Sequence, residues 1–409
     1  MMKRRDVVVA GASALAAALA LALAVPASAQ STDRSPIKIG EINSYTAMPA
    51  FTVPYRQGMQ LAADQINAAG GVLGRKLELV IRDDAGKPED AVRVAGELVT
   101  NEKVAVLSGT FFSHIGLAVS EYARMNKVLF VASEPLTDAL TLDKGHRYAY
   151  RLRPSTLMQV GMLVEEAAKL PAKKWVTIAP NYEYGQSAVR AFKELLKAKR
   201  PDVEFAAEQW PAQGKLEAGP TVQALLAAEP EAVFNVTFGA DLAKLVREGT
   251  TRGLFEKRAV VSLLTGEPEY LDPLKEEAPA GWIVTGYPHD QIATPEHTAF
   301  RAAYVKAFND YPRLGSVVGY TLIQSIAAAV AKAGGTDTEK LADAMAGLKL
   351  ASPFGPIEYR GLDHQATMGA YVGTIAVKDG KGVMTGWRYA DGAVYAPAEA
   401  VVKARRPTQ

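Results

Sequence analysis

Between residues 37 and 133, short apolar runs alternate with segments of helical periodicity. The runs that predict strands cover residues 37–42, 76–84, 104–108 and 128–133. Between the first two, Met59, Ala62, Ala63 and Ile66 recur at the spacing of a helix with one buried face, and another helix is predicted over 88–101. Strands separated by helices form parallel sheets that are covered on both faces. We therefore predict an open α/β unit in this part of the chain.

The same alternation restarts after residue 170. Strands are predicted over 175–179, 203–210, 232–238 and 259–264, and helices near 185–199, 219–228 and 240–252. A further strand in 281–288 leads into three helices, near 295–310, 315–333 and 338–347. From residue 355 onward, short strands surround glycine-rich turns, which favours an antiparallel ending. The chain thus contains two α/β units, and such sheets bind ligands outside the carboxyl ends of their strands.

The stretch SGTFFSHIGLA, residues 108–118, joins a predicted strand to a predicted helix. Helix N-termini offer unpaired N–H groups and a positive dipole end to an anion. Thr110, Ser113 and the neighbouring amides can therefore hold a carboxylate, with Phe111 or Phe112 as the apolar wall of a small pocket. The alternative is equally open at this point: both phenylalanines belong to the core, and Ser113 only caps its helix.

The first 29 residues have the three parts of a secretory signal peptide. The basic start MMKRR precedes an apolar run from Val7 to Val25, and Ala27-Ser28-Ala29 fits the rule for the cleavage site. We predict cleavage after Ala29. A membrane anchor is the weaker alternative, because the run is rich in alanine and ends at a cleavage site. No later segment is expected to be long and apolar enough to cross a bilayer.

Charge and cysteine content exclude several classes of function. The whole chain has a formal net charge of +2, and loss of Lys3, Arg4, Arg5 and Asp6 with the signal peptide brings it to zero. A neutral chain lacks the basic surface that binds nucleic acid, so no nucleic-acid partner is expected. The absence of cysteine excludes disulfides, thiolate metal sites, a cysteine nucleophile and a lipid-modified N-terminal cysteine. We predict a periplasmic protein without a lipid anchor.

Four long stretches resemble one family of exported proteins. They are residues 58–99, 181–197, 232–249 and 319–337. The first is the most specific, because a Gly-Gly pair follows DQIN, a GRKLELV strand comes next, and Asp83-Asp84 precede a helix. Over residues 36–395 the chain resembles the periplasmic solute-binding proteins of the branched-chain amino acid (Leu/Ile/Val-binding) ABC transporter family.

This resemblance implies the type I periplasmic binding protein fold, of α/β class, with two parallel-sheet lobes joined by three crossover strands. Lobe one would comprise residues 36–152 plus 287–352, and lobe two residues 153–286 plus 353–400. The crossings would fall near 150–155, 285–290 and 351–357. The resemblance also implies a function. The chain would be the extracytoplasmic subunit of an ABC importer that captures a small carboxylate-bearing ligand between the lobes and delivers it to a membrane permease.

The resemblance assigns candidate ligand-binding residues by position. They are Ser44, Tyr45, Thr110, Phe112, Ser113, Ser133, Glu134, Tyr182, Tyr184, Phe238 and Glu267. The carboxylate of a bound amino acid would meet Thr110, Ser113 and Ser133, and its ammonium group would meet Glu267. Tyr184 would close over the ligand, and the remaining residues would line the cleft.

Two departures from the family's pattern bear on the ligand. Phe111-Phe112 stand where amino-acid binders have small hydroxyl residues, and together with Tyr182 and Tyr184 they favour an aromatic or bulky apolar ligand. Glu134 brings a carboxylate toward the ligand's own carboxylate, which is repulsive unless Glu134 is protonated or turned away. The ligand class therefore includes branched-chain or other amino acids and aromatic acids.

Two other functions are compatible with part of the sequence. The same fold can present its ligand to a sensor, and the sequence does not distinguish that role from delivery to a permease. An exported hydrolase is less favoured, because Ser113 lies outside a G-x-S-x-G motif and no histidine pair has the H-E-x-x-H spacing. No enzymatic activity, cofactor or metal is expected.

Overall fold

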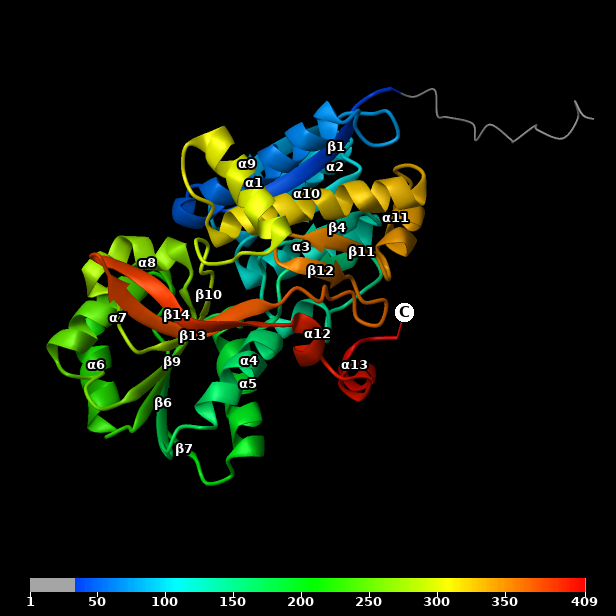
Figure 1. The fold of residues 1–409 in the computed structure, drawn as a ribbon. Helices are drawn as coiled ribbons and strands as arrows, with labels where there is room; N and C mark the ends of the chain where they lie inside the picture. The colour runs from blue at the N-terminus through cyan, green and yellow to red at the C-terminus, as the bar shows by residue number, and fades with distance from the viewer. Residues whose placement is uncertain (1–33, 409) are drawn as a thin grey trace, which may run out of the picture. The chain divides into compact units, whose positions relative to one another are not determined.

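A five-stranded parallel sheet forms the first part of the fold (Figure 1). The computed structural model describes residues 34–408, so the predicted signal peptide lies outside the described residues. In the spatial order β2-β1-β3-β4-β5, the strands are Leu77–Asp83, Ile37–Asn43, Val106–Gly109, Leu129–Ala132 and Ala149–Arg151. The helices that connect the first four strands are α1 (Pro49–Ala68), α2 (Pro88–Thr100) and α3 (Ser113–Asn126). Every neighbouring pair of strands is parallel, as predicted.

A seven-stranded sheet forms the second part, in the order β14-β13-β10-β9-β8-β6-β7. Its strands are β6 (Lys174–Ile178), β7 (Glu204–Gln209), β8 (Ala232–Asn235), β9 (Ala259–Gly266), β10 (Ile283–Gly286), β13 (Ala370–Lys378) and β14 (Lys381–Ala390). The helices of this part are α4 (Thr156–Ala167), α5 (Glu183–Lys199), α6 (Ala218–Ala227), α7 (Gly239–Thr251) and α8 (Pro268–Leu274), with a 3₁₀ turn at Lys275–Glu277. β6 to β10 are parallel, whereas β13 and β14 add an antiparallel edge. The predicted antiparallel ending is thus confirmed.

The chain passes between the two sheets three times. After β5 it enters the second part, and after β10 it returns to form α9 (Pro295–Phe308), α10 (Leu314–Ala333) and α11 (Thr338–Met345), of which α10 packs along α1. The antiparallel hairpin of β11 (Lys349–Ser352) and β12 (Gly355–Glu358) precedes the last passage. The two-lobed α/β fold is therefore as predicted. The predicted lobe boundary after residue 352 falls in the turn of this hairpin, and the boundaries stay a prediction.

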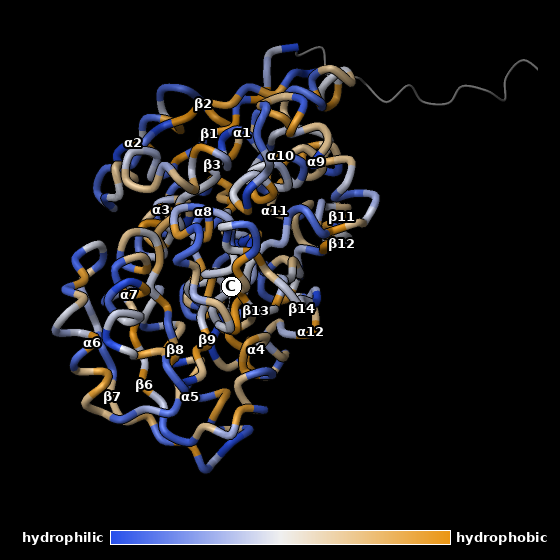
Figure 2. The backbone as a smooth tube through the Cα atoms, turned by 60° about the vertical axis from the view of Figure 1, so that its left-hand side comes forward, coloured by the Kyte–Doolittle hydropathy of each residue, from blue (hydrophilic) through white to orange (hydrophobic). Residues whose placement is uncertain are grey.

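The inner strands of both sheets are buried between layers of helices, whereas the edge strands β2, β7 and β14 are partly exposed. β3, β4 and β8 have no exposed residue, and Figure 2 shows apolar segments along β1 and α4. Helix α4 has no counterpart among the predicted elements. Its sequence, TLMQVGMLVEEA, buries residues on most of its sides, which blurs the period of an amphipathic helix. The hydroxyl of Ser155 nevertheless caps it by accepting a hydrogen bond from Met158 N, 3.2 Å away.

Helix α10 corrects one expectation from the sequence. Within residues 34–408, it is long and apolar enough to cross a bilayer by length and composition. However, 78% of its apolar stretch is buried inside the protein. It lies beside α1, and its apolar faces form part of the core. Its hydrophobicity is therefore explained by protein packing. The short elements Asp138–Leu140 (3₁₀), α12 (Gly392–Tyr395) and α13 (Glu399–Arg405) complete the described chain.

We expect Gly319→Ala to lower the free energy of unfolding by about 1–3 kcal/mol, the usual cost of overpacking. Glycines bring α1 and α10 together: a Cβ on Gly319 would lie 2.1 Å from Tyr55 O, and one on Gly58 would lie 2.0 Å from Ser316 O. Gly335→Ala is the control, because nothing lies within 4 Å of its Cβ position. Urea unfolding of both variants measures the effect. Equal midpoints would show that the helices do not need this close approach.

Candidate ligand-binding site

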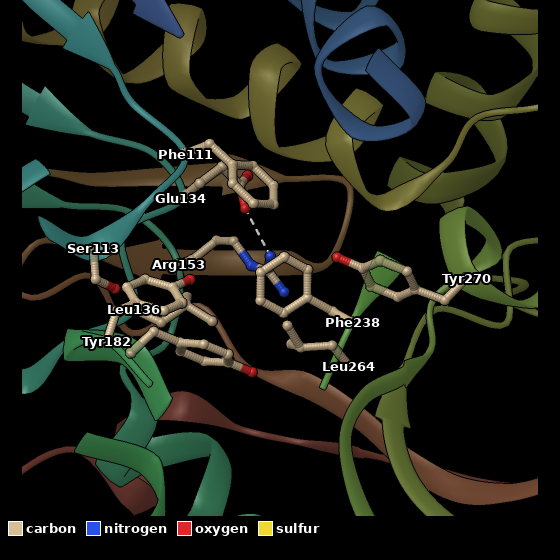
Figure 3. Close-up of a pocket in the computed structure, with 10 residues that line it drawn as sticks. Phe111, Ser113, Glu134, Leu136, Arg153, Tyr182, Phe238, Leu264 and Tyr270 are labelled. Atoms are coloured by element: carbon tan, nitrogen blue, oxygen red, sulfur yellow. Dashed lines mark hydrogen bonds and ion pairs between the residues drawn. The ribbon is translucent and has the colours of Figure 1, made fainter. Parts of the chain in front are cut away.

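A pocket is lined by residues that follow strands of both sheets (Figure 3). From the first part of the fold, the segments that follow β3, β4 and β5 contribute Phe111, Ser113 at the start of α3, Glu134, Leu136 and Arg153. The second part of the fold contributes Leu264 of β9 and, from segments that follow its strands, Tyr182, Tyr184, Phe238 and Tyr270. The space that a water-sized sphere can reach between them is only about 20 Å³, so the lining side chains nearly fill the pocket. The carboxyl ends of both sheets thus build one site for a small molecule.

Aromatic rings from the two parts meet around this pocket. The ring centroids of Phe111 and Phe238 lie 6.2 Å apart, and those of Tyr184 and Phe238 lie 5.9 Å apart. Tyr182 touches the first part as well, with its centroid 6.1 Å from that of Phe112. These spacings are typical of favourable aromatic pairs. Rings from both sides therefore enclose the pocket and present flat apolar surfaces to its contents.

The polar centre of the pocket is a buried ion cluster. Nη1 of Arg153 lies 2.7 Å from Glu134 Oε2, and its Nη2 lies 2.6 Å from Glu267 Oε1. The other carboxylate oxygens, Glu134 Oε1 and Glu267 Oε2, are buried without a hydrogen-bond partner. Figure 3 shows Phe111, Phe238 and Tyr270 around the Arg153 guanidinium. One cation thus serves two glutamates, and each glutamate keeps one acceptor atom unused.

Burial sets the protonation of this cluster. Loss of solvation raises the pKa of Glu134 and of Glu267 to about 7 in each case, although Arg153 acts in the opposite direction. Burial lowers the pKa of Arg153, but the two glutamates outweigh it and raise the pKa above its ordinary value. Arg153 is therefore always charged, and the glutamates change protonation near neutral pH.

Two residues with left-handed backbone flank the pocket. Thr110 has φ 62° and Leu264 has φ 66°, although neither is glycine. Val284 of β10 pairs with Ser262 of β9, and Gly286 of β10 pairs with Gly266 of β9. β9 therefore has extra residues between these two pairs, and it bulges at Leu264. Bulges and strained residues gather at functional sites, where they redirect side chains. Here Leu264 lies in the bulge, and its side chain lines the pocket.

The structure brings five of the eleven sequence-predicted residues to the pocket wall. They are Ser113, Glu134, Tyr182, Tyr184 and Phe238. Ser113 Oγ accepts a hydrogen bond from Thr137 N at 3.2 Å, whereas the Tyr184 hydroxyl is buried without a partner. The wall thus offers a hydroxyl, a carboxyl group and three rings from predicted positions.

The other six predicted residues do not line the pocket. They are Ser44, Tyr45, Thr110, Phe112, Ser133 and Glu267. Ser44 donates to Asp84 Oδ1 at 2.6 Å, and the buried hydroxyls of Thr110 and Ser133 have no partner. Phe112 is only 2% exposed and lies in the core, and Phe111 forms the wall instead. The two rings touch edge to face, with centroids 5.0 Å apart, but only Phe111 reaches the pocket. Contact of these six residues with the ligand stays a prediction.

The candidate list lacks Arg153, Leu136, Leu264 and Tyr270, all of which line the pocket. Arg153 had a detectable signal, because it stands in YRLRPS, a segment that the resemblance places at a crossing between lobes. A buried cation at such a crossing needs acidic partners, and Glu134 and Glu267 are those partners. The sequence pattern did not indicate Leu264 or Tyr270. A bulge in β9 brings Leu264 to the pocket, and the start of α8 brings Tyr270 there.

Two parallel-sheet units that enclose a small pocket at their carboxyl ends define a ligand-binding protein of the two-lobed class. The sequence profile of the family described as periplasmic binding protein matches residues 36–381. The chain therefore belongs to the periplasmic binding protein family, whose members are extracytoplasmic binding proteins. In the described chain, 34–408, no cluster of three or more His, Asp or Glu side chains could hold a metal ion.

Individual relatives are distant but cover most of the chain. A Leu/Ile/Val-binding protein homologue of Brucella suis is 27% identical over 80% of this chain and 83% of its own. A Pseudomonas aeruginosa amino acid binding protein is 27% identical over 75% of this chain and 81% of its own. A Rhodopseudomonas palustris ABC-transporter solute binding protein, solved in complex with 3,4-dihydroxybenzoic acid, is 26% identical. The two structures superpose with a TM-score of 0.76, and the match covers 88% of this chain and 98% of the relative's chain.

Proposed function

We propose that this protein is the extracytoplasmic substrate-binding subunit of an ABC importer. It captures a small carboxylate-bearing ligand, an amino acid or an aromatic acid, and delivers it unchanged to a membrane permease. The observation that carries the proposal is the pocket itself, which both sheets line with aromatic rings around Arg153 and Glu134. The predicted signal peptide (1–29) and the absence of cysteine support a periplasmic protein without a lipid anchor.

The arrangement of the site explains how binding is coupled to closure. Each wall of the pocket comes from a different sheet, so a ligand gains all its contacts only when both walls approach it. A ligand that touches both sides stabilises the closed form over the open one. A shift from mostly open to mostly closed needs a preference of roughly 5.5 kcal/mol. Ring contacts and charge-assisted hydrogen bonds in a desolvated pocket can supply this. The permease would then recognise the closed form.

The ligand's place follows from the same contacts. Its apolar body packs against Phe111 and Phe238, the ring pair that joins the two walls of the pocket. Its charged end lies toward Arg153 and Glu134, the charged groups on the pocket wall. An amino acid would in addition direct its ammonium group toward the glutamates, in keeping with the role proposed for Glu267. Isoleucine and 3,4-dihydroxybenzoate represent the two ligand classes, since these or related compounds are named for relatives.

We expect one of these two probes to raise the melting temperature of the purified protein. At 100 times its dissociation constant, a ligand adds roughly 2.7 kcal/mol of stability.

Phe238→Ala should weaken binding of that probe more than tenfold in calorimetry, because it removes the ring that faces Phe111. Phe255→Ala is the matched control in the same part of the fold, since Phe255 packs on Trp282 with centroids 4.8 Å apart and does not line the pocket. If neither probe binds, the proposed ligand classes are wrong.

A further inference from the structure

The pocket contains no cation that is free to meet an anionic ligand. Among the residues that line it within the described chain, Arg153 is the single cationic side chain. Both of its terminal nitrogens already face carboxylate oxygens, at 2.7 Å from Glu134 and 2.6 Å from Glu267. When both glutamates are ionised, the cluster has a net negative charge. A ligand that is only an anion therefore meets repulsion at the polar end of the pocket.

The two glutamates are not equivalent with respect to the ligand. Glu134 lines the pocket, and its Oε1 is buried without a hydrogen-bond partner. Glu267 is bound to the same guanidinium but is not among the residues that line the pocket. An incoming carboxylate would therefore approach Oε1 of Glu134. Two carboxylates in such contact cannot both be ionised, and a shared proton between them removes the repulsion.

We infer that an anionic carboxylate ligand binds to this protein together with one proton, which Glu134 accepts from the solvent. The protonated Glu134 then donates a hydrogen bond to the ligand carboxylate, while Arg153 supplies the positive charge beside it. A zwitterionic amino acid needs no such proton, because its ammonium group meets the ionised glutamate. Glu134 thus makes the affinity for plain carboxylates, but not for amino acids, dependent on pH. This inference rests on the proposed function.

The groups around Glu134 are compatible with this role. Arg153 faces it from the β5–α4 link, Glu267 lies across Arg153 on the β9–α8 link, and α8 contributes Glu269. Tyr55 of α1, Tyr184 of α5 and Tyr270 of α8 are nearby phenols, and burial raises the pKa of each above its ordinary value of about 10, so all three stay neutral in this pH range. The imidazole of His114 packs on Tyr182. Since burial raises the pKa of Glu134 to about 7, this carboxyl can accept a proton under mild conditions.

Calorimetry in two buffers of different ionisation heat counts the protons taken up on binding. The probes are benzoate, whose carboxylate is its only titratable group, and isoleucine. For benzoate and the unmodified protein, we expect uptake of close to one proton at pH 8.5 and an affinity about tenfold or more weaker at pH 8.5 than at pH 6. Glu134→Gln should abolish both effects, because a neutral amide repels no carboxylate. For isoleucine we expect no uptake in either protein.

Glu267→Gln is the matched control, because it makes the same change on the other partner of Arg153. It should leave the proton uptake with benzoate in place. Benzoate binding only to the Glu134→Gln variant would overturn the inference, because Glu134 would then exclude the anion and not accept a proton with it. Absence of proton uptake in the unmodified protein, or equal uptake in Glu134→Gln, overturns it. So does binding of isoleucine while benzoate binds neither protein, but that result leaves the proposed function intact. Failure of both probes with both proteins removes the proposed function as well.

Discussion

Replacement of Arg153 by methionine is expected to lower the free energy of unfolding by about 3–5 kcal/mol, the usual cost of removing one partner of a buried ion pair. The side chains of Arg153, Glu134 and Glu267 are all at most 6% exposed. Without the guanidinium, two buried carboxylates face each other with no cation. They must either remain ionised and repel or take up protons. The loss should therefore be larger at pH 8 than at pH 6, as urea unfolding at both pH values can show.

The triple variant Arg153→Met, Glu134→Gln, Glu267→Gln is the control for this prediction. It removes all three charges, and replacing a whole buried ion cluster is often close to neutral for stability. We expect it to recover most of the stability that Arg153→Met loses. If the triple variant is as unstable as the single one, the arginine contributes through packing of its side chain and not through its charge.

Between pH 7 and pH 8.5, the free energy of unfolding is expected to fall as the pH rises. Burial raises the pKa of Glu41 and of Glu269 to about 8 each, compared with about 4.5 for an unperturbed glutamate. At pH 7 the folded protein therefore holds protons that the unfolded chain has already released, and stability falls wherever the folded state binds more protons. Each such proton changes the folding equilibrium constant by about tenfold per pH unit.

Histidines act in the opposite direction but at lower pH. Burial lowers the pKa of His146 and His297 to about 4 and that of His364 to about 3, so unfolding at pH 5–6 is accompanied by proton uptake on these rings. Above pH 7.5 these histidines are neutral in both the folded and the unfolded state, so only the carboxyl groups change stability there.

Glu41→Gln should flatten the slope of the unfolding free energy against pH between pH 7 and 8.5, because it removes one of the two carboxyl groups. The amide can still occupy the site formed by Ser108 and Tyr55. A slope unchanged in this variant would assign the effect to other groups.

The candidate site shows where prediction from sequence reached its limit. Tyr182, Tyr184 and Phe238 were identified by position, and all three line the pocket. Phe111 and Phe112 could not be separated, because both precede a helix and only the backbone angles decide which ring points outward. Arg153 was missed because its role depends on Glu134 and Glu267, which lie 19 and 114 residues away along the chain. Such contacts have no local periodicity.

By itself, the sequence determined the class of fold and the place of the pocket. Hydrophobic periodicity is a local property, and the order of strands and helices follows from it. The alternation therefore predicts two parallel sheets whose carboxyl ends carry the loops that bind a ligand. Only the tertiary structure decided which side chains from these loops meet, that one arginine serves two glutamates, and that one of them faces the pocket. These features depend on distances between segments remote in sequence, and such distances are fixed only when the two sheets pack against each other.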